Sequence, residues 1–169
     1  MEFTNQYDQD FFDETPLMLA IENKDYPQII SLLESNVDPY EVNKFGSTAI
    51  SAACCNGDFT IIQILHEYGV DVNKIIYGAD IPLICACNTG NIDIIKFLVE
   101  HGASLNIKDN MDRTALIVAT QRKHTHIVKY LLDKGADKKY EDIYQLTAFH
   151  YSLINIPYMI NMELCFILM

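Results

Sequence analysis

The sequence predicts an all-α solenoid in which short pairs of helices stack on one another, and three observations predict it. A triplet that starts at Thr or Ile returns at intervals of 33 residues. Apolar residues later in each unit keep this interval, and six of the seven glycines fall at the expected turns. The triplets are Thr15-Pro16-Leu17, Thr48-Ala49-Ile50, Ile81-Pro82-Leu83, Thr114-Ala115-Leu116 and Thr147-Ala148-Phe149; the apolar ladders are Ile29, Ile62, Ile95, Val128 and Leu32, Leu65, Leu98, Leu131.

Each unit is expected to contain two short helices. After the first triplet, Leu17, Ala20 and Ile21 have the spacing of one helix face and predict a first helix of about nine residues. The second helix has a clearer apolar stripe, as in residues 94–99, and Pro27 stands near its start, where a missing N–H breaks no helical hydrogen bond. A helix pair of this size cannot bury its own apolar face, so neighbouring units must stack into a continuous core.

The fourth unit shows most clearly which family this pattern resembles. Its segments are Asp109-Asn110-Met111-Asp112-Arg113-Thr114-Ala115-Leu116, Ile127-Val128-Lys129-Tyr130-Leu131-Leu132 and Gly135-Ala136-Asp137. From about Asp10 to the C-terminus the chain resembles an ankyrin-repeat protein of about five units. The resemblance implies an ankyrin-repeat solenoid of stacked helix-turn-helix units with β-hairpin fingers, no cofactor, and a protein partner bound along a concave groove.

The resemblance also divides the chain. Residues 1–14 are expected to form an N-terminal cap with the first finger, and residues 15–169 a single repeat domain. Its units begin near Thr15, Thr48, Ile81, Thr114 and Thr147. Only the last unit has the family's usual histidine three residues after the repeat Thr, so we expect modest stability. Ile76 and Ile81 replace the family's usual Asp and Thr, and Gly78 lies one position off, so we expect an irregular third finger.

Composition excludes several classes of protein. The 12 basic and 23 acidic residues give a net charge of −11, which opposes binding to the phosphate backbone of nucleic acids. No uninterrupted apolar run reaches the ~18 residues of a membrane span. Five cysteines without disulfide or metal spacing, and Glu2 where a signal peptide would carry positive charge, favour a reduced, cytoplasmic protein.

No pattern typical of an enzyme occurs in the sequence. We find no nucleophile beside a base, no paired carboxylates and no phosphate-binding glycine loop, because the repeat turns already account for the glycines. Cys54 and Cys87 share a repeat position and are interpreted as buried core thiols, because packed helices lie too far apart for a disulfide. His124 and His126 have no third ligand placed nearby by the repeat, so the sequence predicts no metal site.

The candidate partner-binding residues follow from the resemblance, which places them on the fingertips and beside them. The fingertip candidates are Phe12, Lys44, Phe45, Tyr77, Met111 and Tyr144, and the polar candidates are Arg113, Gln121 and Arg122. Aromatic residues, Met and Arg are typical anchors of protein interfaces. A groove with an apolar floor and a basic end would suit an acidic, partly hydrophobic protein segment. The alternative interpretation is that the tips pack on neighbouring fingers.

The C-terminal tail, residues 158–169, is apolar where a terminal repeat normally has a polar outer face. Three interpretations remain open: it packs back on the fourth unit, it would be covered by a further unit in a longer array, or it mediates weak self-association. We therefore expect a non-enzymatic interaction module that acts as an adaptor or competitive inhibitor. The alternative is a structural or truncated fragment that self-associates through this face. A composition with 22 Ile and 11 Ala is typical of an AT-rich genome; an origin in an intracellular parasite would favour delivery into a host cell.

Overall fold

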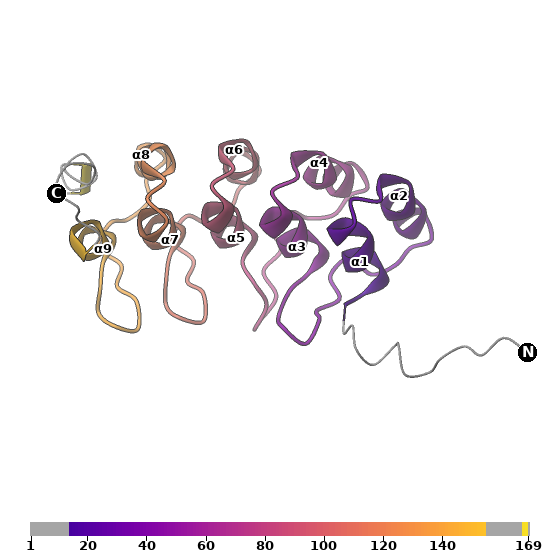
Figure 1. The fold of residues 1–169 in the computed structure, drawn as a ribbon, viewed down its shortest axis with the longest axis horizontal. Helices are drawn as coiled ribbons and strands as arrows, with labels where there is room; N and C mark the ends of the chain where they lie inside the picture. The colour runs from indigo at the N-terminus through magenta and orange to yellow at the C-terminus, as the bar shows by residue number, and fades with distance from the viewer. Residues whose placement is uncertain (1–13, 155–166, 169) are drawn as a thin grey trace, which may run out of the picture.

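The fold is a row of stacked helix pairs. The computed structural model describes residues 14–154 and 167–168. Within them, the helices are α1 (Pro16–Glu22), α2 (Tyr26–Glu34), α3 (Ala49–Asn56), α4 (Phe59–Glu67), α5 (Pro82–Thr89), α6 (Ile92–Glu100), α7 (Ala115–Gln121), α8 (Thr125–Asp133) and α9 (Ala148–Ile154). Figure 1 shows α1, α3, α5, α7 and α9 in an inner row, with α2, α4, α6 and α8 forming an outer row above it. The predicted all-α solenoid is therefore confirmed.

The repeated triplet marks the start of each inner helix. The side chains of Thr15, Thr48 and Thr114 accept a hydrogen bond from the backbone N–H three residues later, which caps the helix. Ile81 has no such oxygen, but Pro82 follows it at the first helical position, where its fixed φ favours the helix. The inner helices span seven or eight residues, shorter than predicted, because in the first four units the turn to the outer helix begins directly after them.

The apolar ladders form the core between the two helix rows. Ile29, Ile62, Ile95 and Val128 are all fully buried, as are Leu65, Leu98 and Leu131. Leu32 is only half-buried, because among the described residues it has a neighbouring unit on one side alone. Four helix pairs and the inner helix α9 are described, so the count of five complete units stays a prediction.

The fingers are loops that project from the inner row, below it in Figure 1. The second, third, fourth and fifth fingers have their turns at residues 43–47, 76–80, 109–113 and 142–146. The second finger is closed by a hydrogen bond from Asn43 N to Ser47 O (3.0 Å), and the fourth and fifth have the same closure. No strand is assigned in residues 14–154, so the implied β-hairpins are present as closed loops without strand ladders.

Three of these fingers share one turn, and the third differs. In the shared turn, an Asn or Asp side chain accepts hydrogen bonds from the backbone N–H groups two and four residues later; these side chains are Asn43, Asp109 and Asp142. Ile76 has no oxygen at this position. Its finger turns instead through Gly78 at φ +80°, one position earlier than the left-handed residue of the other fingers. The expected irregularity of the third finger is confirmed.

Backbone hydrogen bonds join neighbouring fingers in pairs. Asp80 N in the third finger donates to Gly46 O in the second at 2.6 Å, and the Ser47 hydroxyl donates to the Asp80 carboxylate at 2.8 Å. Ile143 N in the fifth finger donates to Met111 O in the fourth at 3.1 Å. The second finger is thereby held to the third and the fourth to the fifth, which positions the residues at their tips.

The residues that precede the outer helices join adjacent units. Asp58 caps the start of α4. It accepts a hydrogen bond from the Tyr26 hydroxyl at 2.9 Å and forms an ion pair with Lys24 at 3.4 Å, and both partners belong to the preceding unit. Asn91 begins α6 and donates to Gly57 O at 2.9 Å. His124 takes the same place before α8, and its ring donates to the backbone carbonyl of Asn88.

The His124 joint makes the stability of the stack depend on pH. Burial is the main cause that lowers the pKa of His124 from its ordinary 6.5, and the nearby His126 and Arg122 charges lower it further, against the opposing hydrogen bond to Asn88. The unfolded chain therefore binds this proton more readily, so the contribution of His124 is complete above pH 6.5 and is lost as pH falls toward the lowered value. We expect His124→Asn, which copies Asn91, to show a smaller loss of unfolding free energy between pH 7 and pH 5 in urea titrations. Equal losses in both proteins would contradict this assignment.

Candidate partner-binding groove

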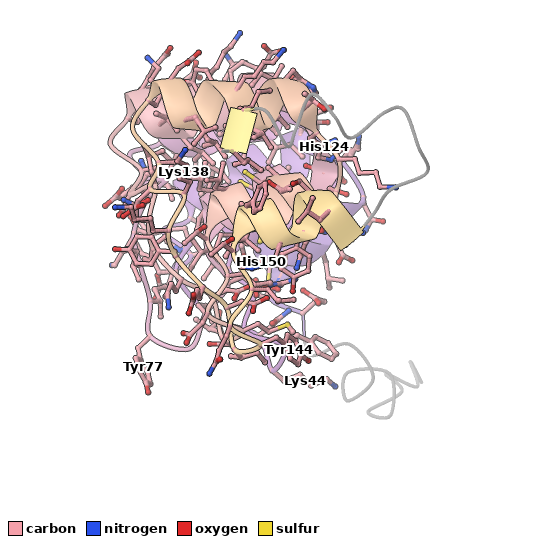
Figure 2. All side chains as sticks on the ribbon, turned by 90° about the vertical axis from the view of Figure 1, so that its left-hand side faces the viewer. Lys44, Tyr77, His124, Lys138, Tyr144 and His150 are labelled. Carbon is pink, nitrogen blue, oxygen red and sulfur yellow. The ribbon has the colours of Figure 1, made fainter. Side chains whose placement is uncertain are left out.

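The most exposed apolar side chains of the described residues stand at the fingertips. Phe45 is 69% exposed, Tyr144 is 62% exposed, and Tyr77 is fully exposed, while Met111 is at 36%. Figure 2 shows Tyr77, Tyr144 and Lys44 at the same lower edge of the molecule. The side chains of Phe45, Tyr77 and Tyr144 thus face outward, which argues against the alternative that the tips pack on neighbouring fingers. We call Phe45, Tyr77, Met111 and Tyr144 the fingertip row.

The turn geometry explains where this row stands. Phe45, Met111 and Tyr144 occupy the same position of the shared turn, and their backbone N–H groups donate to the Asn or Asp side chain that holds it. In the third finger Gly78 takes this position, so the aromatic side chain comes one residue earlier, at Tyr77. Lys44 lies beside the row, with its ammonium 5.2 Å from the centre of the Phe45 ring.

A hollow of about 280 Å³ lies between the third and fourth fingers and the inner helices. Residues from the third and fourth fingers and from α3, α5 and α7 line it: Cys55, Asp80, Ile81, Ile84, Cys85, Asn88, Asp109, Arg113, Val118 and Arg122. We call it the groove hollow. It contains two of the predicted polar residues, together with two aspartates that the sequence analysis did not single out.

The two arginines of the groove hollow differ in their partners. Arg113 pairs with Asp109 in its own finger, with Nη2 2.7 Å and Nε 2.9 Å from the same carboxylate oxygen, and Gln121 accepts a longer bond from Nη1 at 3.4 Å. Arg122 is exposed and donates from Nε to Asn88 Oδ1 at 2.6 Å. Its terminal amino groups meet no acceptor from residues 14–154, so Arg122 is the cation best placed to receive a carboxylate.

The charge of the groove therefore differs from the predicted basic end. Asp80 and Asp109 balance the two arginines at the groove hollow, so it is not uniformly basic. Arg113 and Gln121 hold the fourth finger against α7, which gives them a structural role whether or not they also contact a partner. A sequence signal existed for Asp109, because it stands at the repeat position that holds the turn of the second, fourth and fifth fingers.

The cysteine and histidine interpretations can now be placed. Cys54 and Cys87 are fully buried, which confirms that they are core thiols. The rings of His124 and His126 are 6.3 Å apart between centroids. Among the described side chains, no three His, Cys, Asp or Glu gather in a way that could hold a metal ion.

Some predicted features lie outside the described residues. They are Phe12 and most of the tail, residues 158–169, so the partner contact of the former and the self-association of the latter stay predictions. Within the tail, Leu168 is described and is buried. None of the helices in residues 14–154 and 167–168 is long and apolar enough to cross a membrane.

Comparisons with known proteins agree with this architecture. The family model described as ankyrin repeats (3 copies) matches residues 2–76, 75–142 and 105–158, which together span most of the chain. A comparison with curated protein sequences gave no match. Helix pairs stacked at a 33-residue interval, with fingers projecting from the inner row, are what such repeats build. The chain belongs to the ankyrin-repeat family.

Proposed function

We propose that the protein is a non-enzymatic interaction module, an adaptor or competitive inhibitor, that binds a partner protein across the fingertip row and the groove hollow. Ankyrin repeats are generally protein–protein interaction modules, because stacked units form an extended binding surface. The observation that carries the proposal is the fingertip row itself. Exposed aromatic side chains held by rigid turns are typical anchors of a protein interface, since they lose little entropy on binding.

The groove chemistry indicates what the partner segment presents. The fingertip row would bind apolar side chains of the partner, and Arg122 would bind a carboxylate next to them. Asp80 and Asp109 oppose a run of several acidic residues at the groove hollow. We therefore narrow the expected partner to a largely hydrophobic segment with one acidic side chain near α7, rather than a strongly acidic one.

The test places a photo-crosslinking benzophenone amino acid at Tyr77, in the fingertip row. Tyr68 serves as the matched control, because it is a 43% exposed tyrosine that follows the outer helix α4. A protein that crosslinks from position 77 and not from position 68 would support the groove as the binding surface. Crosslinking only from position 68, or equally from both, would contradict it.

Affinity then measures how much the fingertip row contributes. Once crosslinking has identified the partner, we expect Phe45→Ala, Tyr77→Ala, Met111→Ala and Tyr144→Ala in one variant to weaken binding by at least about tenfold, since anchor residues each contribute about 2 kcal/mol or more. Tyr68→Ala should leave the affinity unchanged. Circular dichroism of both variants checks that the stack remains folded. Unchanged binding by the fourfold variant would refute the proposal.

The alternative function, a fragment that associates through its C-terminal end, has one observation in its favour. A hollow of about 520 Å³ is lined, in the described part of the chain, by Lys138, Lys139, Thr147, Phe149 and Leu168. Phe149 and Leu168 supply apolar surface there beside two lysines. A further repeat unit or a second copy of the chain could cover such a surface, and self-association of this kind would favour the fragment over the groove.

A further inference from the structure

Two histidines meet at the ends of neighbouring outer helices, in the row that lies away from the fingers in Figure 1. His66 is in the last turn of α4, and His101 is the residue that ends α6 in the next unit. Their ring centres are 4.6 Å apart, and both residues are exposed and line a hollow of about 220 Å³. Neither the proposed groove nor the buried core uses this pair of side chains.

We propose that His66 and His101 together bind one divalent transition-metal ion of the kind that prefers imidazole, such as Zn²⁺ or Ni²⁺. The ion would join the second unit to the third. Water completes its coordination, since no third His, Cys, Asp or Glu of the described residues is near enough to be a ligand. The site is separate from the fingertip row and the groove hollow, so it goes beyond the proposed function and is tested without a partner protein.

The separation of the two rings fits a shared ion. A metal bound to two imidazole nitrogens at ~2.0–2.1 Å, with an angle of about 90–110° between the two bonds, holds the ring centres about 4.5–5.2 Å apart. The 4.6 Å between His66 and His101 lies within this range. The 70° between the ring planes also fits, because each ring can rotate about its own metal–nitrogen bond. The exposed ring of His66 can turn until its nitrogen and that of His101 face the same point.

The hydrogen bond of His101 leaves one of its nitrogens available to a metal. Its Nδ1 lies 2.7 Å from the backbone oxygen of Phe97. A carbonyl oxygen only accepts, so Nδ1 carries the proton and Nε2 keeps a lone pair. Metal-bound histidines commonly have this arrangement, in which the other N–H donates to a backbone carbonyl. No hydrogen bond from the described residues occupies the ring nitrogens of His66, so they too are available.

Neighbouring groups hold the two rings close to each other. The Phe97 ring packs against both, with centroid distances of 5.3 Å to His66 and 4.0 Å to His101. Asn73 Nδ2 donates to the backbone oxygen of His101 at 2.9 Å, which ties the end of α6 to the loop that follows α4. The fold therefore brings the two ligands together before any metal binds, as a specific site requires.

The charge around the pair favours a cation. Both histidines lie at the C-terminal ends of helices, where the helix dipole attracts positive charge. Asp71 lines the same hollow, and Glu67 and Glu100 adjoin the two histidines in the sequence. We expect Asp71 to accept a hydrogen bond from water on the metal.

The experiment titrates Ni²⁺ into the full chain under reducing conditions, followed by isothermal titration calorimetry. We expect the wild type to bind one ion at this site, and His66→Gln and His101→Gln each to weaken that binding by at least about tenfold, because one of two protein ligands is lost. His126→Gln is the matched control. His126 is an exposed histidine that also has a histidine neighbour, but the ring centres there are 6.3 Å apart, too far for one ion. The control should keep the affinity of the wild type.

Thermal unfolding gives a second measurement, because an ion that joins two units stabilises the folded stack. At a free Ni²⁺ concentration of about 100 times the dissociation constant, we expect the melting temperature of the wild type to rise by about 5 °C or more. The same Ni²⁺ concentration should leave the melting temperatures of His66→Gln and His101→Gln nearly unchanged.

Three results would overturn the assignment. The first is a wild type that binds no Ni²⁺. The second is equal Ni²⁺ affinity in the wild type, His66→Gln and His101→Gln, which would place the ion elsewhere. The third is a loss of binding in His126→Gln as large as in the other two variants. Circular dichroism of all three variants ensures that each result refers to the folded stack.

Discussion

Leu98→Ala is expected to cause the largest loss of stability of any single truncation that we consider, about 2–5 kcal/mol. Leu98 lies fully buried in α6, within the continuous apolar core that links adjacent units. The substitution removes buried methyl groups and leaves a cavity in the core, because the neighbouring units cannot move in to fill it. Since each unit of a solenoid is stabilised by its neighbours, a weakened third unit also loosens the units on both sides.

Urea denaturation followed by circular dichroism measures this loss. Leu153→Ala is the matched control, because Leu153 in α9 is 41% exposed and its truncation leaves no buried cavity. A loss of several kcal/mol would remove much of the free energy of unfolding of a domain of this size. If Leu98→Ala costs no more than Leu153→Ala, the core is not packed as described.

Gly90→Ala is expected to be the most damaging change at a turn. Gly90 ends α5 with φ +82°, a left-handed conformation that costs an alanine about 1 kcal/mol. In addition, a Cβ there would lie 2.6 Å from Cε1 of the His124 ring. The ring must therefore shift, and we expect the shift to weaken its hydrogen bond to Asn88 and with it the joint between the third and fourth units.

Gly57→Ala isolates the contribution of the His124 contact. Gly57 ends α3 with φ +66°, at the same repeat position, but a Cβ there meets no atom within 4 Å. We expect Gly90→Ala to lower the free energy of unfolding by more than Gly57→Ala, and His124→Ala to cancel part of the difference in a double-mutant cycle. Equal effects of the two glycine substitutions would show that the imidazole does not rest on Gly90.

Periodicity explains why most of the fold could be predicted from the sequence. A 33-residue interval determines which residues begin each inner helix and which enter the core, and Ile76 identified the irregular finger because it lacks a side-chain oxygen. The length of the inner helices was overestimated, because helical spacing alone does not show that residues such as Arg122 end the helix rather than extend it.

The groove was predicted less completely, because its contacts depend on folded geometry. The Asp109–Arg113 pair forms only when the fourth finger closes. The sequence does not reveal this pair, so Arg113 was predicted to be a cation available to a partner.

The pairing of the fingers has a mechanical consequence. The second and third fingers share a backbone hydrogen bond, as do the fourth and fifth, whereas no backbone bond links the third to the fourth in residues 14–154. The finger edge therefore consists of two hydrogen-bonded pairs of fingers, and the groove hollow lies where the two pairs meet. In residues 14–154 no backbone hydrogen bond between fingers opposes separation of the two pairs, so we expect the groove to widen at this point when a bulky side chain binds, with the turn inside each finger unchanged.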